Sequence, residues 1–259
     1  MKPAKVFSLL QFNMQYGQPW LGEGGGEPPV DLEQTIAFLR EQDTDVILLQ
    51  EIEHASGGTN QIEPPPNFTR IQNALDSYQG YFSYPEPDPD ELPFGIGQAI
   101  LSRFPLSAMS RKVLPAPDVY FSFKGKRQRP APRLLIGART TINGQALEIF
   151  NVHLQAFFMI GASSDEYPAQ GEEVIDEVAR VKVPALIGGD FNCAPGERLV
   201  EKFSQAGLQP CQREAVTWKR RPYVLDHVFH NGGLRCLSHE VVETDVSDHH
   251  ALRVELAFA

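Results

Sequence analysis

The sequence is poor in cysteine and in long apolar runs, and each shortage argues against a class of protein. Its 259 residues include only three cysteines, Cys193, Cys211 and Cys236. Their number is odd and their spacing is not that of a metal site, so we interpret them as reduced thiols of a cytoplasmic protein. No window approaches the roughly 18 apolar residues that a membrane-spanning helix needs. We therefore expect no membrane span.

Positive charge is also scarce. Lysine and arginine total 23 against 33 acidic residues, which gives a formal net charge of −10. This balance argues against a protein that coats nucleic acid through a broad basic surface. It leaves open a nuclease whose acidic residues are neutralised by bound metal.

Several catalytic motifs are missing. Neither Ser102 nor Ser107 lies in a Gly-x-Ser-x-Gly elbow, and no argument gives Cys193 an activating environment. The glycine-rich residues 22–26 are not followed by Lys-Ser/Thr, so they form no Walker A loop. No two ligands have the spacing of a zinc finger or a zincin, which makes zinc the less favoured metal.

Short apolar runs indicate that strands outnumber helices. The N-terminus has Lys2 and Lys5, then residues 6–10 with no small-residue cleavage site behind them, which indicates a first strand rather than a signal peptide. The predicted strands are residues 6–13, 46–49, 98–103, 134–141, 147–152, 185–187, 224–229, 234–242 and 251–256. The predicted helices follow an N-cap at Asp31 to about residue 42, then span 68–78, 172–181 and 196–206.

This pattern predicts an α+β or α/β fold in which sheet packs on sheet and helices lie outside. Asn143-Gly144, between two predicted strands, is a strong hairpin signal. No internal repeat or linker divides the chain, so we expect one domain over residues 1–259.

Polar residues follow many of these strands. Glu51 comes just after a buried strand, where a carboxylate is a good Mg²⁺ ligand, although a solvated acid is the simpler alternative. Asp190 and Asn192 flank Phe191 and would share one face of an extended segment. Asp190 could then orient and deprotonate a water that Asn192 helps to hold, with an Asx turn as the alternative.

Two histidines complete the pattern. In the pair Asp248-His249, the carboxylate could orient or charge the imidazole, which would stabilise negative charge developing on phosphorus. His250 should face the opposite way from His249. His153 ends a strand, where a satisfied core histidine competes with a catalytic one.

The densest basic stretch is residues 124–129 together with Arg133. It could be a solvated hairpin, or an arm that contacts substrate phosphate through Lys126, Arg127 and Arg129. The apolar segment 157–160 is the one candidate for a lipid contact, and burial in the core would explain it equally well.

The motifs QFN at 11–13, LQE at 49–51, NVHL at 151–154, GGDFN at 188–192, LDH at 225–227 and SDH at 247–249 together resemble the endonuclease/exonuclease/phosphatase superfamily, with the DNase I-like fold. The resemblance covers nearly the whole chain, including the strand-turn element at residues 97–106. It implies a four-layer α/β/β/α sandwich. One departure is His227, where many DNA-repair members carry an aromatic residue.

The resemblance also implies roles for particular residues. The implied metal ligands are Asn13, Glu51, Asp190 and Asp248, and the implied catalytic residues are His153, Asp190, Asn192, Asp226, Asp248 and His249. In this assignment Asp190 and Asn192 activate the water, Asp226 supports that centre, and His249 stabilises the transition state.

We therefore expect a monomeric, cytoplasmic hydrolase that uses Mg²⁺, or alternatively Mn²⁺, to cleave a phosphate ester by attack of water at phosphorus. The substrate stays open between DNA, RNA, a nucleotide or inositol phosphate, and a sphingomyelin-type lipid. A DNA- or RNA-processing endo- or exonuclease of the same superfamily is the main alternative. A binding module without catalysis is disfavoured because each expected catalytic position is filled.

Overall fold

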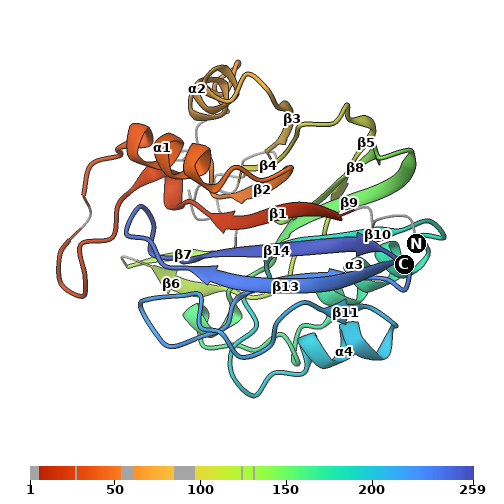
Figure 1. Cartoon of the computed structure of the whole chain (residues 1–259). Helices are drawn as coiled ribbons and strands as arrows, with labels where there is room; N and C mark the ends of the chain where they lie inside the picture. Colours follow the sequence, from red (N-terminus) through yellow and green to blue (C-terminus); the bar gives the residue numbers. More distant parts are fainter. Residues whose placement is uncertain (1–5, 27, 54–60, 85–96, 124, 131) are drawn as a thin grey trace.

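Two six-stranded sheets pack face to face in the computed structural model of the chain (Figure 1). The structure describes residues 6–26, 28–53, 61–84, 97–123, 125–130 and 132–259, so Lys2 and Lys5 lie outside it. The first sheet has the order β13 (Leu234–Val242), β14 (Ala251–Phe258), β1 (Val6–Asn13), β2 (Val46–Gln50), β4 (Gln98–Ser102) and β3 (Gln79–Ser83). The second has the order β11 (Gln209–Pro210), β12 (Asp226–His230), β10 (Ala185–Asp190), β9 (Gln145–His153), β8 (Leu134–Ile142) and β5 (Ser107–Val113).

Both sheets are mixed. β1 runs parallel to β2, and β9 runs parallel to β10, whereas the other neighbours in the two sheets are antiparallel. A separate small hairpin joins β6 (Phe121–Phe123) to β7 (Lys126–Gln128). Because parallel neighbours begin and end at the same edge, the polar residues after β1 and β2, and those after β9 and β10, come to one end of the sandwich.

Helices cover the outer faces of both sheets (Figure 1). The helical segments are α1 (Leu32–Gln42), α2 (Pro66–Ala74), α3 (Ala169–Ala179) and α4 (Leu199–Gln205), with short 3₁₀ turns η1 (Gln15–Gly17) and η2 (Phe157–Ile160). Asp31 caps α1 as expected, since its Oδ1 accepts the N–H of Gln34 at 3.3 Å. Among the described residues, no helix is long and apolar enough to cross a membrane.

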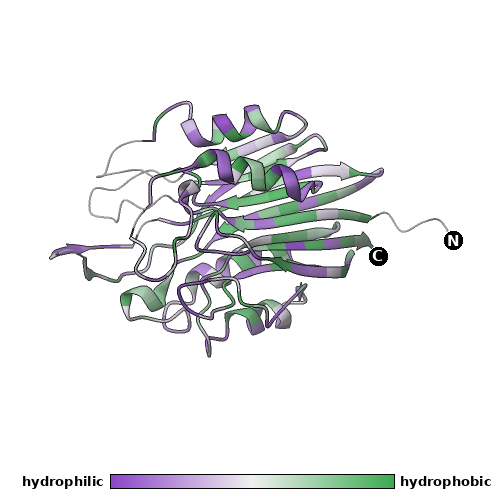
Figure 2. Ribbon diagram, turned by 60° about the vertical axis from the view of Figure 1, so that its left-hand side comes forward, coloured by the Kyte–Doolittle hydropathy of each residue, from purple (hydrophilic) through white to green (hydrophobic). Residues whose placement is uncertain are grey.

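The core is divided into three layers by the two sheets. Side chains alternate along each strand, so Leu9 packs between the sheets while its neighbour Leu10 packs under α1 and α2. A third cluster joins α3 and α4 to the second sheet through residues such as Val174 and Phe203. Figure 2 shows the apolar colour concentrated along the strands. Three apolar layers between four layers of structure confirm the predicted α/β/β/α sandwich.

Some boundaries differ from the sequence prediction. The helix predicted over 68–78 is α2, which begins at Pro66 and ends at Ala74, because proline suits the first helical turn and the chain must then enter β3 beside β4. The strands β3 and β5 were not predicted. The Asn143-Gly144 turn is confirmed, with positive φ angles of 53° and 78° at its two residues, as a tight hairpin requires.

Candidate active site

The polar motifs meet at one end of the sandwich because of strand register. Asp190, the last residue of β10, lies opposite His153 on parallel β9 and opposite Asp226 on antiparallel β12. In the first sheet Asn13 ends β1 beside Gln50, which places Glu51 just beyond the edge. Residues that are far apart in sequence therefore occupy neighbouring positions.

Gly189 allows this close approach. A Cβ atom at this position would lie 2.0 Å from the carbonyl oxygen of Val152 on β9, so only glycine fits. The next residue is Asp190, whose place between β9 and β12 depends on that contact.

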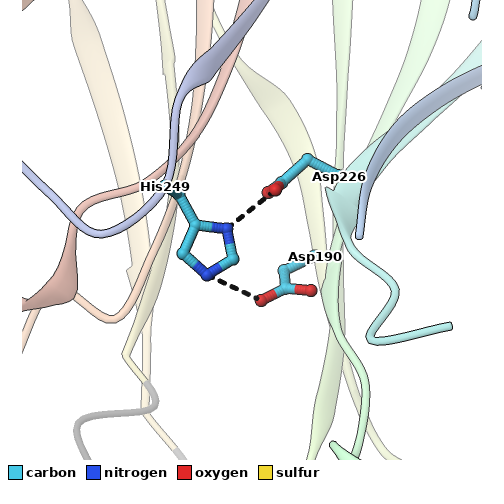
Figure 3. A group of neighbouring side chains, drawn as sticks. All are labelled: Asp190, Asp226 and His249. Atoms are coloured by element: carbon cyan, nitrogen blue, oxygen red, sulfur yellow. Dashed lines mark hydrogen bonds and ion pairs between the residues drawn. The ribbon is translucent and has the colours of Figure 1, made fainter. Parts of the chain in front are cut away.

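His249 lies between two carboxylates (Figure 3). Its Nδ1 donates to Asp226 Oδ2 at 2.8 Å, and its Nε2 is 3.8 Å from Asp190 Oδ2. All three side chains are buried, and one potential ligand atom from each lies within 4.8 Å of the others. We call this arrangement of Asp226, His249 and Asp190 the relay. Its atoms could also contribute to a metal site.

Mutual electrostatics set the charges of this relay. Burial would lower the pKa of His249, but Asp226, followed by Asp190 and Asp248, raises it to about 10. Burial would raise the pKa of Asp226, but the charge and hydrogen bond of His249 lower it. Burial, and then the nearby Asp226, raise the pKa of Asp190 to about 7. At neutral pH the relay therefore combines a charged imidazole with one carboxyl that readily gains or loses a proton.

Asn13 joins this relay to Glu51. Its Nδ2 donates to Glu51 Oε1 and to Asp190 Oδ2, both at 3.0 Å. Burial, and then the negative charge of Asp248, raise the pKa of Glu51. Glu51 also has a φ of 51°, in the left-handed region that a glutamate rarely adopts. Two carboxylate oxygens are thus held around one amide nitrogen, which makes them candidate donors for a cation.

His153 is neutral in this setting. Burial, and then the charges of Arg133 and His249, hold its pKa well below the usual range. Its Nε2 lies 3.6 Å from Asp190 Oδ2 and 3.8 Å from Glu51 Oε1. Its Nδ1 has no hydrogen-bond partner among the described residues. The ring is therefore not the hydrogen-bonded core histidine that the sequence left as an alternative.

The segment after β10 forms the Asx turn that its sequence allowed, and it also places Asp190 and Asn192 at one cavity. Asp190 Oδ1 accepts the backbone N–H of Asn192 at 2.9 Å, which is an Asx turn. Asn192 has a φ of 47°, and its Nδ2 donates to the carbonyl of Leu154 at 3.0 Å. Asn192 nevertheless lines the same cavity as Asp190, so the turn presents both residues to that cavity.

Asp248 takes a different partner from the one its sequence position indicated. Its Oδ2 accepts from Arg220 Nε at 2.6 Å and from Trp218 Nε1 at 3.3 Å. Asp226, not Asp248, holds the ring of His249. As predicted, His250 faces away from this cluster: its Nδ1 accepts a backbone N–H from the preceding loop.

A buried set of amides, which we call the amide ladder, supports the relay from within the core. Gln11 and Gln50 exchange side-chain hydrogen bonds of 2.7 and 2.8 Å, and Gln50 Nε2 also donates to Asn151 Oδ1 at 2.6 Å. Gln11 Nε2 donates to Asp226 Oδ1 at 2.9 Å. The ladder therefore links the first sheet to the second and ends on the carboxylate that holds His249.

Sequence reasoning did not identify the amide ladder. The available signal was a glutamine inside each of two otherwise apolar strands, since a fully buried amide needs partners. Trp218 and Arg220 were also missed as partners of a site residue.

A cavity of about 350 Å³ opens beside these residues. Its polar lining includes Glu51, His153, Asp190, Asn192, Asp248 and His249, together with Arg133 and Arg220. The apolar segment 157–160, predicted either to contact lipid or to lie in the core, is divided between core and cavity. Phe157 is buried, whereas Phe158, Met159 and Ile160 line the cavity.

The basic residues Lys126, Arg127 and Arg129, which we call the basic arm, lie on and after β7. The guanidinium of Arg127 lies 3.9 Å from the ring centre of Tyr120. No residue of the basic arm is among the described residues that line the cavity, and Lys124 lies outside the description. Arg133, from the same basic stretch, does line it.

Comparison with known proteins gives a family match and several similar folds. The family described as "Endonuclease/Exonuclease/phosphatase family" matches residues 10–249. A UPF0294 protein of Yersinia pseudotuberculosis is 31% identical over 140 residues, which are 50% of this chain and 52% of that protein. One from Vibrio vulnificus is 33% identical over 120 residues, 43% of this chain and 40% of that protein. The chain thus spans about half the length, or less, of the curated relatives it matches.

Solved structures share the fold at low identity. An endonuclease/exonuclease/phosphatase from Beutenbergia cavernae has a TM-score of 0.71 and 20% identity, covering 98% of this chain and 72% of that one. The human Nocturnin catalytic domain with bound sulfate has a TM-score of 0.67 and 20% identity, covering 98% and 94%. A mannosyl-6-phosphatase from Bacteroides thetaiotaomicron has a TM-score of 0.63 and 17% identity, covering 97% and 100%.

Proposed function

Because the chain belongs to the endonuclease/exonuclease/phosphatase family, whose members are generally hydrolases of phosphoester bonds, we propose that it is a divalent-metal-dependent hydrolase that cleaves a phosphate ester by attack of water at phosphorus. The observation that carries the proposal is the relay in which His249 lies between Asp226 and Asp190. It supplies a charged imidazole and a carboxyl with a pKa of about 7 at one end of a cavity.

Each residue of the relay has a proposed role. Asp190, with its pKa of about 7, is matched to accepting a proton from the attacking water near neutral pH. His249, charged and fixed by Asp226, would stabilise negative charge that develops on the phosphate oxygens. Asn192 would orient the water. Neutral His153 would donate its one ring N–H to a phosphate oxygen.

The side chains present fit a hard cation such as Mg²⁺. Glu51 and Asp190 direct carboxylate oxygens at the same amide of Asn13, and the pKa values of both carboxyls are raised. Oxygen donors of this kind are what Mg²⁺ and Mn²⁺ prefer. We therefore propose Glu51 and Asp190 as ligands, joined by Asn13 once its amide turns so that Oδ1 in place of Nδ2 faces the cation, with Asp248 close enough to influence Glu51. A metal ion bound there would neutralise negative charge on the phosphate.

The test combines chelation with a substrate panel. Exhaustive EDTA treatment should abolish hydrolysis of phosphomonoesters and phosphodiesters, and Mg²⁺ or Mn²⁺ should restore it. Calorimetry should show that Glu51→Gln weakens Mg²⁺ binding by about tenfold or more, whereas Glu41→Gln, at an exposed position of α1, leaves it unchanged. Full turnover after chelation would contradict metal dependence. No hydrolysis of any ester with either metal would contradict the hydrolase.

A nuclease is the second candidate, and the basic arm is the observation that favours it. A nuclease that tracks a long duplex should lose affinity steeply with salt, with a log–log slope of about −0.9 per phosphate contacted. A protein of net charge −10 should instead show a shallow slope. Measuring duplex binding between low and physiological salt separates the two.

A further inference from the structure

We propose that the cavity is a two-part binding site for a small phosphate ester with an apolar alcohol group. Arg133 binds the phosphate, and an apolar wall binds the alcohol. We define this wall as Phe121, Phe158, Met159 and Ile160, all of which line the cavity. The inference rests on the proposed function, because it names the substrate class of the same site.

Arg133 is a buried cation fixed in position. Only 5% of it is exposed, and it lines the cavity that also contains Glu51 and His153. Its Nε donates to Gln155 Oε1 at 3.4 Å. The backbone N–H of Gln155 in turn donates to Gln170 Oε1 at 3.1 Å, so the supporting amides are themselves held. A guanidinium presents a planar set of donors that matches phosphate oxygens, which makes Arg133 suited to an anion in this cavity.

The apolar wall is built by residues that turn away from the core. Phe157 stacks on Tyr167, with ring centres 5.4 Å apart, and this contact anchors η2. Phe158 then packs against Trp218 at 5.5 Å, and Met159 is left 63% exposed. An exposed thioether beside two further apolar side chains at a cavity with a polar end is a surface that an apolar ligand group would cover.

The size of the cavity limits the occupant. Its volume of about 350 Å³ lies at the lower end of the roughly 300–1,000 Å³ that small-molecule sites occupy. That volume holds a phosphate and one group about the size of a benzene ring, for which a cavity of roughly 150 Å³ suffices. The net charge of −10 further disfavours a polyanion. A compact ester therefore fits better than a duplex or a lipid bilayer.

Binding of two phosphonates to the Mg²⁺-loaded protein tests the apolar wall without turnover. Benzylphosphonate should bind about tenfold more tightly than 2-hydroxyethylphosphonate, because the ring leaves water. The double variant Met159→Ser/Ile160→Ser should reduce this preference to about threefold or less. Met109→Ser/Val113→Ser, which makes comparable apolar-to-serine changes at exposed positions of β5, should keep it. Equal binding of both phosphonates to the unmodified protein would overturn the proposal.

Binding of inorganic phosphate tests the role of Arg133 as the cation that holds the phosphate. Arg133→Gln should weaken phosphate binding by about tenfold or more. Arg133→Lys should weaken it less, since lysine keeps the positive charge but lacks the planar pair of N–H donors. Arg139→Gln, which removes a half-exposed arginine paired with Glu148 on β9, should have no effect. Unchanged phosphate affinity in a folded Arg133→Gln variant would remove Arg133 from the site.

Turnover of benzyl phosphate and 2-hydroxyethyl phosphate separates this inference from the proposed function. Hydrolysis of both esters with equal kcat/KM would leave the hydrolase standing and refute the apolar wall. Selective phosphonate binding without hydrolysis of any ester would support the apolar wall and refute the hydrolase. Displacement of benzylphosphonate by duplex DNA or phosphatidylcholine vesicles at lower phosphate concentration would make a macromolecule the occupant and overturn the proposal.

Discussion

Replacing Asp226 by asparagine should lower the pKa of His249, so that the ring loses its charge at a lower pH. The carboxylate of Asp226 accepts from Nδ1 of His249 at 2.8 Å, and it is the largest of the causes that raise the pKa of that histidine to about 10. Asparagine keeps the size of the side chain and can still accept from Gln11 through its oxygen. The change therefore removes the charge with little change in packing.

The expected magnitude follows from the size of the shift. The pKa of His249 rises from an ordinary 6.5 to about 10. This rise corresponds to roughly 5 kcal/mol in favour of the imidazolium. Losing half of this rise would lower the pKa of His249 to about 8. At pH 9 the charged fraction should then fall from about 0.9 to about 0.1 or less.

Two measurements check this prediction. A histidine that must be charged supports activity below its pKa and loses that support as pH rises through it. The alkaline limb of kcat should therefore move from near pH 10 to near pH 8 in Asp226→Asn, and kcat at pH 9 should fall about tenfold, in proportion to the charged fraction. NMR titration of the His249 ring should show the same shift without substrate. Asp245→Asn, at an exposed carboxylate on the preceding loop, is the matched control and should change neither result.

The reasoning would be refuted if His249 titrated near pH 6.5 in the unmodified protein. It would also be refuted if the ring titrated at the same pH in both proteins, because the carboxylate would then not set its charge.

Other substitutions test other parts of the site. Asp190→Asn should lower kcat by about 10² or more in the Mg²⁺-loaded protein, because it removes the proposed proton acceptor and a proposed metal ligand; unchanged kcat in the folded variant would exclude Asp190 from both roles. His249→Ala should lower kcat to a similar extent, and equal damage from His250→Ala would reverse the assignment of the pair. Neutralising the basic arm tests the nuclease candidate: KM for a nucleic-acid substrate should rise with a smaller effect on kcat, and an unchanged KM would identify the arm as a solvated hairpin. Gly189→Ala should destabilise the fold by about 3 kcal/mol or more in thermal or denaturant unfolding, because its Cβ would collide with the Val152 carbonyl; near-normal stability would contradict this packing.

The sequence predicted where the site residues lie better than it predicted their partners. Apolar strands are recognisable because their side chains must be buried, and Glu51 and Asp190 were identified by following such strands. Which carboxylate serves His249 depends on how the loop before β14 meets β12, and adjacency in sequence favoured Asp248 over Asp226. That choice is a tertiary contact, which local pattern does not contain.

Polar segments were predicted least well. β5 has the sequence SAMSRKV and is largely exposed at the edge of its sheet, so no buried face marked it as a strand. Gln11 and Gln50 stand out as polar residues within apolar strands, but their pairing depends on the stacking of two sheets. The division of residues 157–160 between core and cavity likewise depends on neighbours distant in sequence, such as Trp218. The single domain, the catalytic assignments and the metal stay predictions.

The position of β14 has a consequence for how the protein is made. β14 lies inside the first sheet between β13 and β1, and it pairs Ala257 with Val6. During synthesis β1 emerges well before this partner, so one edge of β1 stays unpaired until the strands and helices between them have been translated. An unpaired apolar edge is a site for aggregation, and pairing over so long a separation is slow. We therefore expect the nascent chain to need protection by chaperones, and its yield to respond to translation speed and temperature more than its final stability would indicate.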